Sequence, residues 1–186
     1  DAYPLLEYAS QEQLRAMVDI DAWVRHDLSV PRWLDWLDLA LAVDYDTAER
    51  FVQAQDDELL MALVTGYSQV LPADADVNMI PDELAFFSSP DFLYVVTVPR
   101  EHPLEERLPQ LMKLLWSADT DRARELFQQA QFELHEANGE DLERFRTARL
   151  QDLGFESVND AIEVFSTVAI KTLRRELEES QTAEGM

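Results

Sequence analysis

The residue types that most enzymes use for catalysis are scarce here, and their spacing does not match a known catalytic or metal-binding pattern. His26, His102 and His135 lie far apart in the sequence, and cysteine is absent. His135 begins a stretch like the zinc signature His-Glu-x-x-His, but Gly139 stands where the second histidine would be. There is no glycine-rich phosphate loop and no serine nucleophile elbow. We therefore assign no catalytic, cofactor-binding or metal-binding residue, and we interpret the histidines as structural.

Four Asp-x-Asp pairs are the strongest candidates for a divalent-cation site, because hard cations prefer several carboxylate oxygens. An aspartate at the start of a helix more commonly accepts a hydrogen bond from a free backbone N–H. The calcium-loop pattern, with its central Gly and final Glu, is missing. We favour capping, by Asp46 for one helix and by Asp119 or Asp121 for another. The pairs are Asp19 and Asp21, Asp44 and Asp46, Asp74 and Asp76, and Asp119 and Asp121.

Three tryptophans are candidates for an aromatic site that stacks on a ligand. Trp33 and Trp36 share a face of one predicted helix, and Trp116 lies in another. Large aromatic residues at helical spacing are usually core residues. We expect these side chains to pack inside the protein.

The chain is strongly acidic, with a formal net charge of −23 over 186 residues. Residues 1–80 carry 16 acids against 4 bases, and residues 81–186 carry 22 against 11, so the acidity is not confined to one tail. Such a surface disfavours nucleic acids and anionic membranes and attracts basic proteins and cations. Arg144, Arg146 and Arg149 form the only compact basic cluster, and pairing with local acids is the interpretation that we favour over binding an anionic partner.

Composition indicates a folded, cytoplasmic domain without a membrane span. Hydrophobic residues make up 47% of the chain, which is enough for a core. The longest apolar stretch, Leu37–Val43, is too short to cross a bilayer and contains Asp38. No signal-peptide pattern precedes Ser10, and the chain begins with Asp1, so we expect a segment of a longer protein.

Helix signals recur along most of the chain and predict a mainly all-α fold of seven or eight helices. Ser10 with Gln13 forms a capping-box pattern, and Ser29 precedes an apolar helix over residues 30–43. Gly154 is expected to end a helix that begins near Glu140. A last helix is expected from Ser157 to about residue 173.

Two segments of the sequence are similar to each other. Trp33–Gln55 aligns without a gap to Leu108–Ala130, at an offset of 75 residues (108 minus 33). In both, an apolar helix runs into Asp-x-Asp-x-Ala and a second helix. This similarity predicts duplicated helix pairs, as in helical-repeat proteins. Such proteins use their stacked helix pairs as binding surfaces.

A proline-rich connector interrupts the helices and predicts a small β-hairpin. Two β-favouring runs, Leu84–Phe87 and Phe92–Val98, flank the turn-rich residues 88–91. A lone hairpin is marginally stable, so it should pack on helices. The predicted organisation, one compact domain overall, is an N-terminal helical unit (1–70), the connector (71–103), a C-terminal helical unit (104–180) and a frayed tail (181–186).

Two stretches resemble an uncharacterised bacterial family of unknown function. They are residues 5–14, leading to Trp23 and residues 33–37, and the signature-like Arg149–Phe155. The family's upstream helices are similar to the acidic superhelical domain of bacterial magnesium transporters, a likeness that only Ser10–Val18 carries here. The resemblance implies an all-helical fold and no catalytic residues, and it does not imply transport.

The sequence therefore favours a non-enzymatic acidic scaffold or adaptor that binds a protein partner without a cofactor, and its charge would attract a basic partner. A domain that responds to divalent cations is the first alternative. An enzyme whose site is assembled from residues distant in sequence is the second.

Overall fold

The computed structural model describes residues 3–132 and 139–155. These contain eight α-helices and two small sheets, which confirms the mainly helical fold. The helices are α1 (Tyr3–Tyr8), α2 (Gln11–Asp21), α3 (Val30–Val43), α4 (Tyr45–Gln53), α5 (Asp57–Thr65), α6 (Pro103–Ala118), α7 (Thr120–Phe132) and α8 (Gly139–Asp152). The strands are β1 (Trp23–Val24), β2 (Asp27–Leu28), β3 (Gln69–Pro72), β4 (Leu84–Ser88) and β5 (Tyr94–Pro99), and a 3-10 turn, η1, covers Val77–Met79.

The chain divides into two compact units, Asp1–Arg146 and Thr147–Met186. In the second unit α8 ends as predicted: Gly154 has a φ of 87°, and the N–H of Phe155 bonds to the carbonyl of Leu150. The predicted last helix from Ser157, the frayed tail and His135 lie outside the described residues. None of the described helices combines the length and the apolar character needed to cross a membrane.

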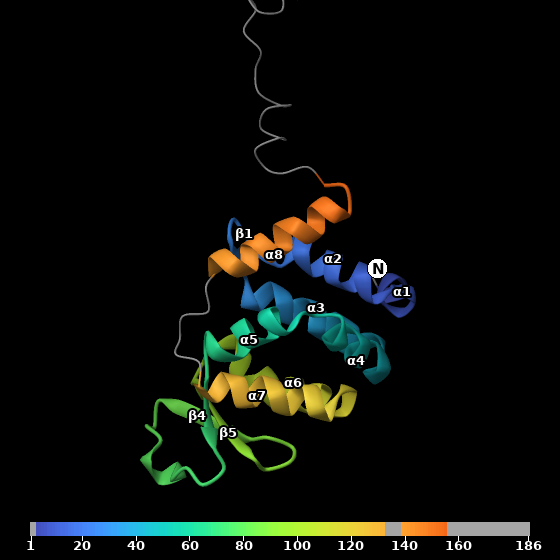
Figure 1. Ribbon diagram of the computed structural model, residues 1–186. Helices are drawn as coiled ribbons and strands as arrows, with labels where there is room; N and C mark the ends of the chain where they lie inside the picture. Colours follow the sequence, from blue (N-terminus) through green and yellow to red (C-terminus); the bar gives the residue numbers. More distant parts are fainter. Residues whose placement is uncertain (1–2, 133–138, 156–186) are drawn as a thin grey trace, which may run out of the picture. The chain divides into compact units, whose positions relative to one another are not determined.

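The first unit is a stack of helix layers with a sheet at one end (Figure 1). Helix α4 packs between α3 and α6, and α7 packs on α6 and β3. The core runs through these layers, with Trp33 and Phe51 fully buried and their ring centroids 5.5 Å apart. Helix α3 has the predicted bounds. Its apolar residues cover more than one stripe, so neighbouring elements enclose it.

Arginines join the layers by donating to carbonyl groups at the ends of helices. Arg122 of α7 bonds to the carbonyls of Gln53, at the end of α4, and Gln55, just after it, at 3.2 and 2.6 Å. Arg50 of α4 bonds to the carbonyl of Glu7 at 2.9 Å. The last carbonyls of a helix have no helical partner, so a guanidinium satisfies them well.

The two similar segments, α3–α4 and α6–α7, use the same one-residue connection. Asp44 accepts from the N–H of Thr47 at 2.7 Å, and Asp119 accepts from the N–H of Arg122 at 3.0 Å. The prediction that Asp46 caps the first of these turns is wrong, because Asp44 is the cap and Asp46 lies inside α4. The backbone N–H of Thr47 holds the pKa of Asp44 below its usual value. The turns match at the offset of 75 residues, while duplication of the whole unit stays a prediction.

The predicted hairpin exists and is part of a larger sheet. β4 and β5 pair antiparallel, with Phe86 opposite Thr97, and both contact α6. β3 was not predicted; it pairs with the other side of β5 and gives the order β3-β5-β4. β3 and β4 are therefore parallel, and the segment between them crosses from one side of β5 to the other. The short pair β1–β2 was also not predicted.

The cap at the second turn gives a stability prediction. Asp119→Ala should lower the free energy of unfolding by about 1 kcal/mol, because the N–H of Arg122 loses its acceptor. Asp121→Ala is the matched control, since its side chain is 92% exposed and lies past the cap; it should change stability by less than half as much. Chemical denaturation measures both. Equal losses would show that Asp119 is not the cap.

Candidate functional site

The structure gives the two described histidines structural contacts. Nδ1 of His102 accepts from the backbone N–H of Leu104 at 3.2 Å, so the side chain caps α6. Its ring stacks on Tyr67 with centroids 4.5 Å apart. Burial lowers the pKa of His102, which favours the neutral ring that capping requires. His26 pairs with Glu143. Neither histidine is placed beside a nucleophile.

The Asp-x-Asp pairs are spread over separate turns rather than brought together. Asp76 caps η1 by accepting from the N–H of Asn78 at 3.0 Å. Asp21 accepts from the indole N–H of Trp36 at 3.1 Å, and Asp44 and Asp119 are caps. Within the described residues, no three carboxylates or histidines gather as a metal site would require.

The tryptophans are packed among other side chains. Trp33 is fully buried, and Trp116, which is 7% exposed, meets Phe127 edge-on with centroids 4.8 Å apart. Trp36 is only partly buried at the edge of the core. Trp33 and Trp116 are core aromatics, as the spacing predicted, and Trp36 is not fully enclosed.

The arginines of the cluster on α8 have different partners. Arg144 pairs with Asp141 at 3.0 Å, as predicted for a local acid. Arg146 instead lies over the ring of Trp23, 5.0 Å from its centroid, and donates to the carbonyl of Asp19. Arg149 belongs to the second unit and also has a partner.

One cavity of about 390 Å³ opens on the first unit. Its wall offers one carboxylate, from Asp27, and one phenol, from Tyr67, among mostly apolar residues. A general acid or base acts on a substrate held by further polar groups. The described lining supplies no such set, so the cavity does not define a reaction.

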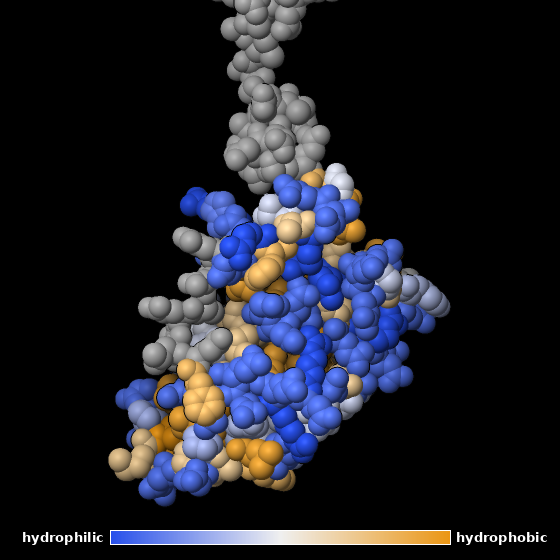
Figure 2. Space-filling model, viewed as in Figure 1, coloured by the Kyte–Doolittle hydropathy of each residue, from blue (hydrophilic) through white to orange (hydrophobic). Residues whose placement is uncertain are grey.

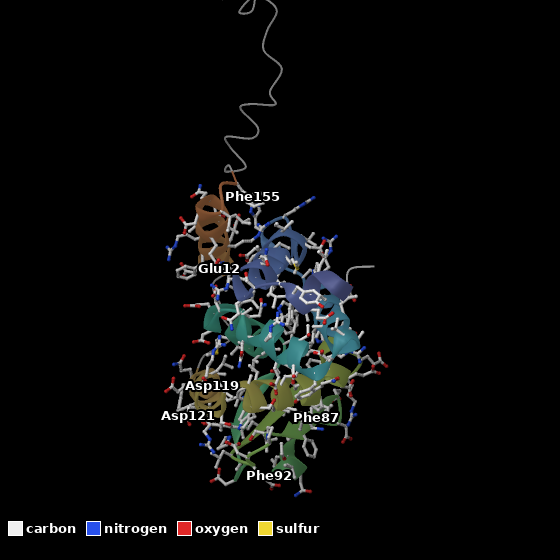
Figure 3. The ribbon with its side chains drawn as sticks, turned by 90° about the vertical axis from the view of Figure 1, so that its right-hand side faces the viewer. Glu12, Phe87, Phe92, Asp119, Asp121 and Phe155 are labelled. Atoms are coloured by element: carbon white, nitrogen blue, oxygen red, sulfur yellow. The ribbon has the colours of Figure 1, made fainter. Side chains whose placement is uncertain are left out.

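The most unusual surface is the exposed apolar part of the β4–β5 hairpin, which we call the hairpin surface: Phe86, Phe92 and Leu93. Their exposed fractions are 47%, 73% and 50%. Figure 2 shows apolar residues gathered at the end of the first unit where β4 and β5 lie, and Figure 3 shows Phe92 at its tip. Val77 and Met79 in the preceding segment are also exposed. Clustered exposed apolar side chains mark interaction sites more often than scattered ones do.

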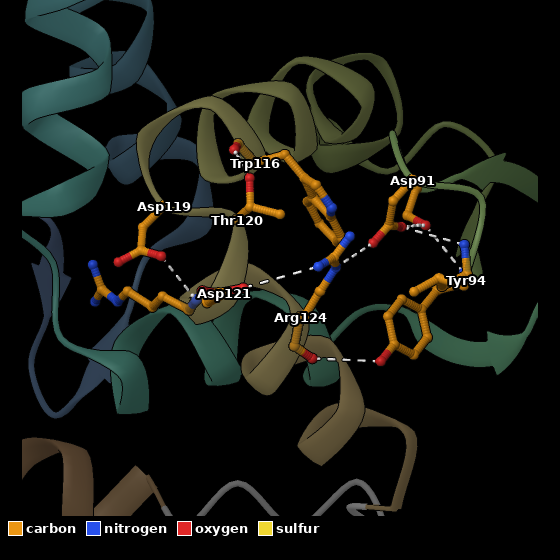
Figure 4. Close-up of polar contacts among 10 residues, drawn as sticks. Asp91, Tyr94, Trp116, Asp119, Thr120, Asp121 and Arg124 are labelled. Carbon is orange, nitrogen blue, oxygen red and sulfur yellow. Dashed lines mark hydrogen bonds and ion pairs between the residues drawn. The ribbon is translucent and has the colours of Figure 1, made fainter.

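A network of polar contacts fixes the turn of this hairpin to α7 (Figure 4). Asp91 pairs with the Nε of Arg124 at 2.9 Å and accepts from the hydroxyl of Ser89 at 2.8 Å. The same hydroxyl accepts from the backbone N–H of Tyr94 at 3.0 Å. Burial raises the pKa of Asp91, but hydrogen bonds led by those from Arg124 and Ser89 outweigh burial and lower the pKa to about 2.

Phe92 occupies an unfavourable backbone conformation. Its φ is 60°, in the left-handed region that glycine or asparagine adopts more easily. A bulky residue there costs roughly 1 kcal/mol, and at 73% exposure the ring recovers little of that cost by burial. The Asp91 network therefore holds an aromatic side chain in a position that contributes little to folding.

The hairpin was predicted from the sequence, but its exposed surface was not. The signal was present in Leu84–Ser88, where alternation places Ala85 inside and Phe86 outside. Which face the helices cover could not be read from this run, because both faces carry apolar side chains. The role of Asp91 depends on Arg124, which lies 33 residues away.

Comparisons with known proteins give a family without a known role. A model described as "Family of unknown function (DUF6178)" matches residues 1–185. No curated protein and no solved structure matches the chain.

The Asp91–Arg124 pair gives a pH-dependent prediction. Asp91→Asn should lower the free energy of unfolding at pH 7 by about 1 kcal/mol, a value reduced by solvent screening because the Arg124 side chain is 46% exposed. A carboxyl with a lowered pKa stabilises the fold above its unfolded value of 3.8 and loses that contribution as pH falls through about 2. The difference between wild type and variant should therefore shrink from pH 4 to pH 2. A difference that stays constant with pH would contradict this role of Asp91.

Proposed function

We propose that this chain, which belongs to the DUF6178 family of unknown function, is a non-enzymatic helical scaffold that presents the hairpin surface to a protein partner. The observation that carries the proposal is Phe92, an aromatic side chain that is exposed and conformationally strained and yet held in place. Residues that lower stability without a folding role are expected at functional sites.

The support for the hairpin is rigid enough to pre-organise a binding surface. Asp91 ties the turn to Arg124 of α7, and the hydroxyl of Tyr94 lies 3.5 Å from the carbonyl of Arg124. Tyr94 also packs on Phe127, with ring centroids 6.1 Å apart. A surface fixed before binding loses less conformational entropy when its partner arrives.

Charge favours a basic partner. Residues 69–101 contain six acids and one base, Arg100. Arg124, which lies next to this segment, is paired with Asp91. The uncompensated carboxylates around an apolar centre suit a partner with apolar anchors and a basic rim, because complementary charge steers association and selects partners.

The alternatives of a cation-responsive domain and of an enzyme stay predictions without a supporting contact among the described residues. The helical-repeat interpretation also stays a prediction. It adds to this proposal the idea that the two helix pairs serve as a stacked support for the sheet.

Phe92→Asn should separate binding from stability. Asparagine tolerates the left-handed backbone, so stability should stay unchanged or rise by about 0.5 kcal/mol. Binding to a purified partner should weaken at least about tenfold, because central aromatic residues dominate interfaces. The partner is obtained by cross-linked affinity capture with wild type, and its affinity is measured by calorimetry.

Tyr8→Asn on α1 is the matched control, since Tyr8 is 80% exposed and lies on a different element. It should leave affinity unchanged. A partner that binds Phe92→Asn as tightly as wild type would refute the proposal.

A further inference from the structure

Strand β4 is an edge of its sheet. The order β3-β5-β4 gives β4 a neighbour on one side only. Helices contact the opposite edge strand, since α5 and α7 both pack on β3. An edge strand presents a row of backbone N–H and C=O groups that can pair with another chain.

The hydrogen bonds at the two ends of β4 indicate which of its residues turn their backbone N–H and C=O groups away from β5. The N–H of Arg100 bonds to the carbonyl of Glu83, and the N–H of Ser89 bonds to the carbonyl of Tyr94, each at 2.9 Å. In an antiparallel pair such bonded positions alternate with positions whose groups point away. Residues 83, 85, 87 and 89 therefore bond to β5, and Leu84, Phe86 and Ser88 point away from it.

The outward direction is supported by Leu84, whose N–H bonds locally to the carbonyl of Pro81 at 3.0 Å. Within the described part of the chain, no hydrogen bond from a turn, a loop or a side chain reaches the N–H or C=O of Phe86 and Ser88. Native edge strands are usually protected by charges, proline or a covering element. Here the open positions carry an exposed phenylalanine and an exposed serine.

We propose that β4 binds an extended segment of a partner protein as a fourth strand, with the backbone of the segment paired to Phe86 and Ser88. This inference rests on the proposed function and names how that surface recognises its partner. The segment carries alternating apolar residues, one of which packs beside Phe86, because side chains of paired strands meet on the same face.

The acidic residues beside β4 predict which residues stand at one end of the bound segment. Asp82 and Glu83 lie immediately before β4 and are exposed. Arg100 donates to the carbonyl of Asp82 at 2.8 Å, but its ion pair is with Glu105, and neither Asp82 nor Glu83 forms an ion pair among the described residues. In an antiparallel arrangement the C-terminal end of the added strand lies beside them. We expect lysine or arginine there, since opposite charges across a pair stabilise it.

A second copy of this chain fits the edge poorly. Antiparallel pairing of two β4 strands centred on Phe86 would place Asp82 and Glu83 of each copy near residues 89–90 of the other, beside Asp91. Each copy also carries a net charge of −23. The pairing would therefore bring acidic side chains of two strongly acidic chains close together, and like charges repel.

The test uses a phage-displayed library of random twelve-residue peptides selected on the immobilised full chain. Enriched peptides should alternate apolar residues and end in basic ones. Amide exchange measured by NMR should show that the N–H groups of Phe86 and Ser88, which exchange rapidly in the free protein, become protected when the best peptide binds. Methylation of peptide nitrogens at every second residue should abolish binding in one register and spare it in the other.

Two variants distinguish backbone pairing from side-chain contact. Ser88→Pro removes an outward N–H without removing a bond to β5, and it should weaken peptide binding about tenfold or more. Ser88→Ala keeps that N–H and should bind like wild type. Circular dichroism verifies that both variants fold.

The outcomes separate this inference from the proposed function. If peptides bind and depend on Phe92 but leave the amides of Phe86 and Ser88 unprotected, strand addition is wrong and the hairpin surface still binds. If selection enriches nothing, or enriches peptides with helical apolar spacing, strand addition is wrong as well. A captured protein partner whose affinity does not depend on Phe92 would overturn both.

Discussion

The arrangement of the first unit depends on one constraint: a three-stranded sheet cannot bury its own faces and must be covered by helices. Contacts with α5, α6 and α7 meet this requirement. The Asp91–Arg124 pair then fixes the free end of the hairpin to α7. Helices α5 and α7 contact β3 and helix α6 contacts β4, and in the order β3-β5-β4 the outer edge of β4 has no neighbouring strand. The location of the exposed surface is thus a consequence of how the sheet is supported.

The elements that the sequence predicted are those encoded locally. The bounds of α3, the capping box at Ser10 and the glycine end of α8 each depend on residues within a few positions of one another. The hairpin was predicted because a turn-rich tetrad separates two β-favouring runs. The wrong prediction of Asp46 as the cap, where Asp44 is the cap, also has a local cause. Only one residue connects the two helices, and the spacing of the aspartates did not show which of them precedes α4.

Features that depend on distant residues, or that lack the usual turn signal, escaped prediction. β3 pairs with β5 more than twenty residues later, and its short run ends in Pro72, which reads as a connector. The strands β1 and β2 have two residues each and turn through Arg25 with a φ of 59°, where glycine or asparagine would have been the expected signal. The hairpin surface was not predicted either, because the exposure of Phe86 and the ion pair of Asp91 with Arg124 depend on residues that only the folded unit brings together.

The contacts of the arginines help to explain why acidic side chains remain exposed on this unit. Arg15, Arg50 and Arg122 donate to carbonyls at helix ends, so part of the positive charge satisfies backbone groups inside the first unit. Carboxylates such as Asp82 and Glu83 remain exposed beside an apolar edge. A surface of this kind discourages pairing between copies and favours a basic segment, which gives selectivity by repulsion as well as by attraction.

The central claim, that the tip of the hairpin meets a protein partner, is tested most directly by photo-crosslinking in the cells that make this protein. The photoreactive amino acid benzoylphenylalanine is placed at position 92 in one version and at position 8 in another, because both native side chains are highly exposed. Irradiation should yield a discrete protein adduct from position 92 and none of the same mass from position 8. Adducts from position 8 alone, or from neither position, would contradict the account.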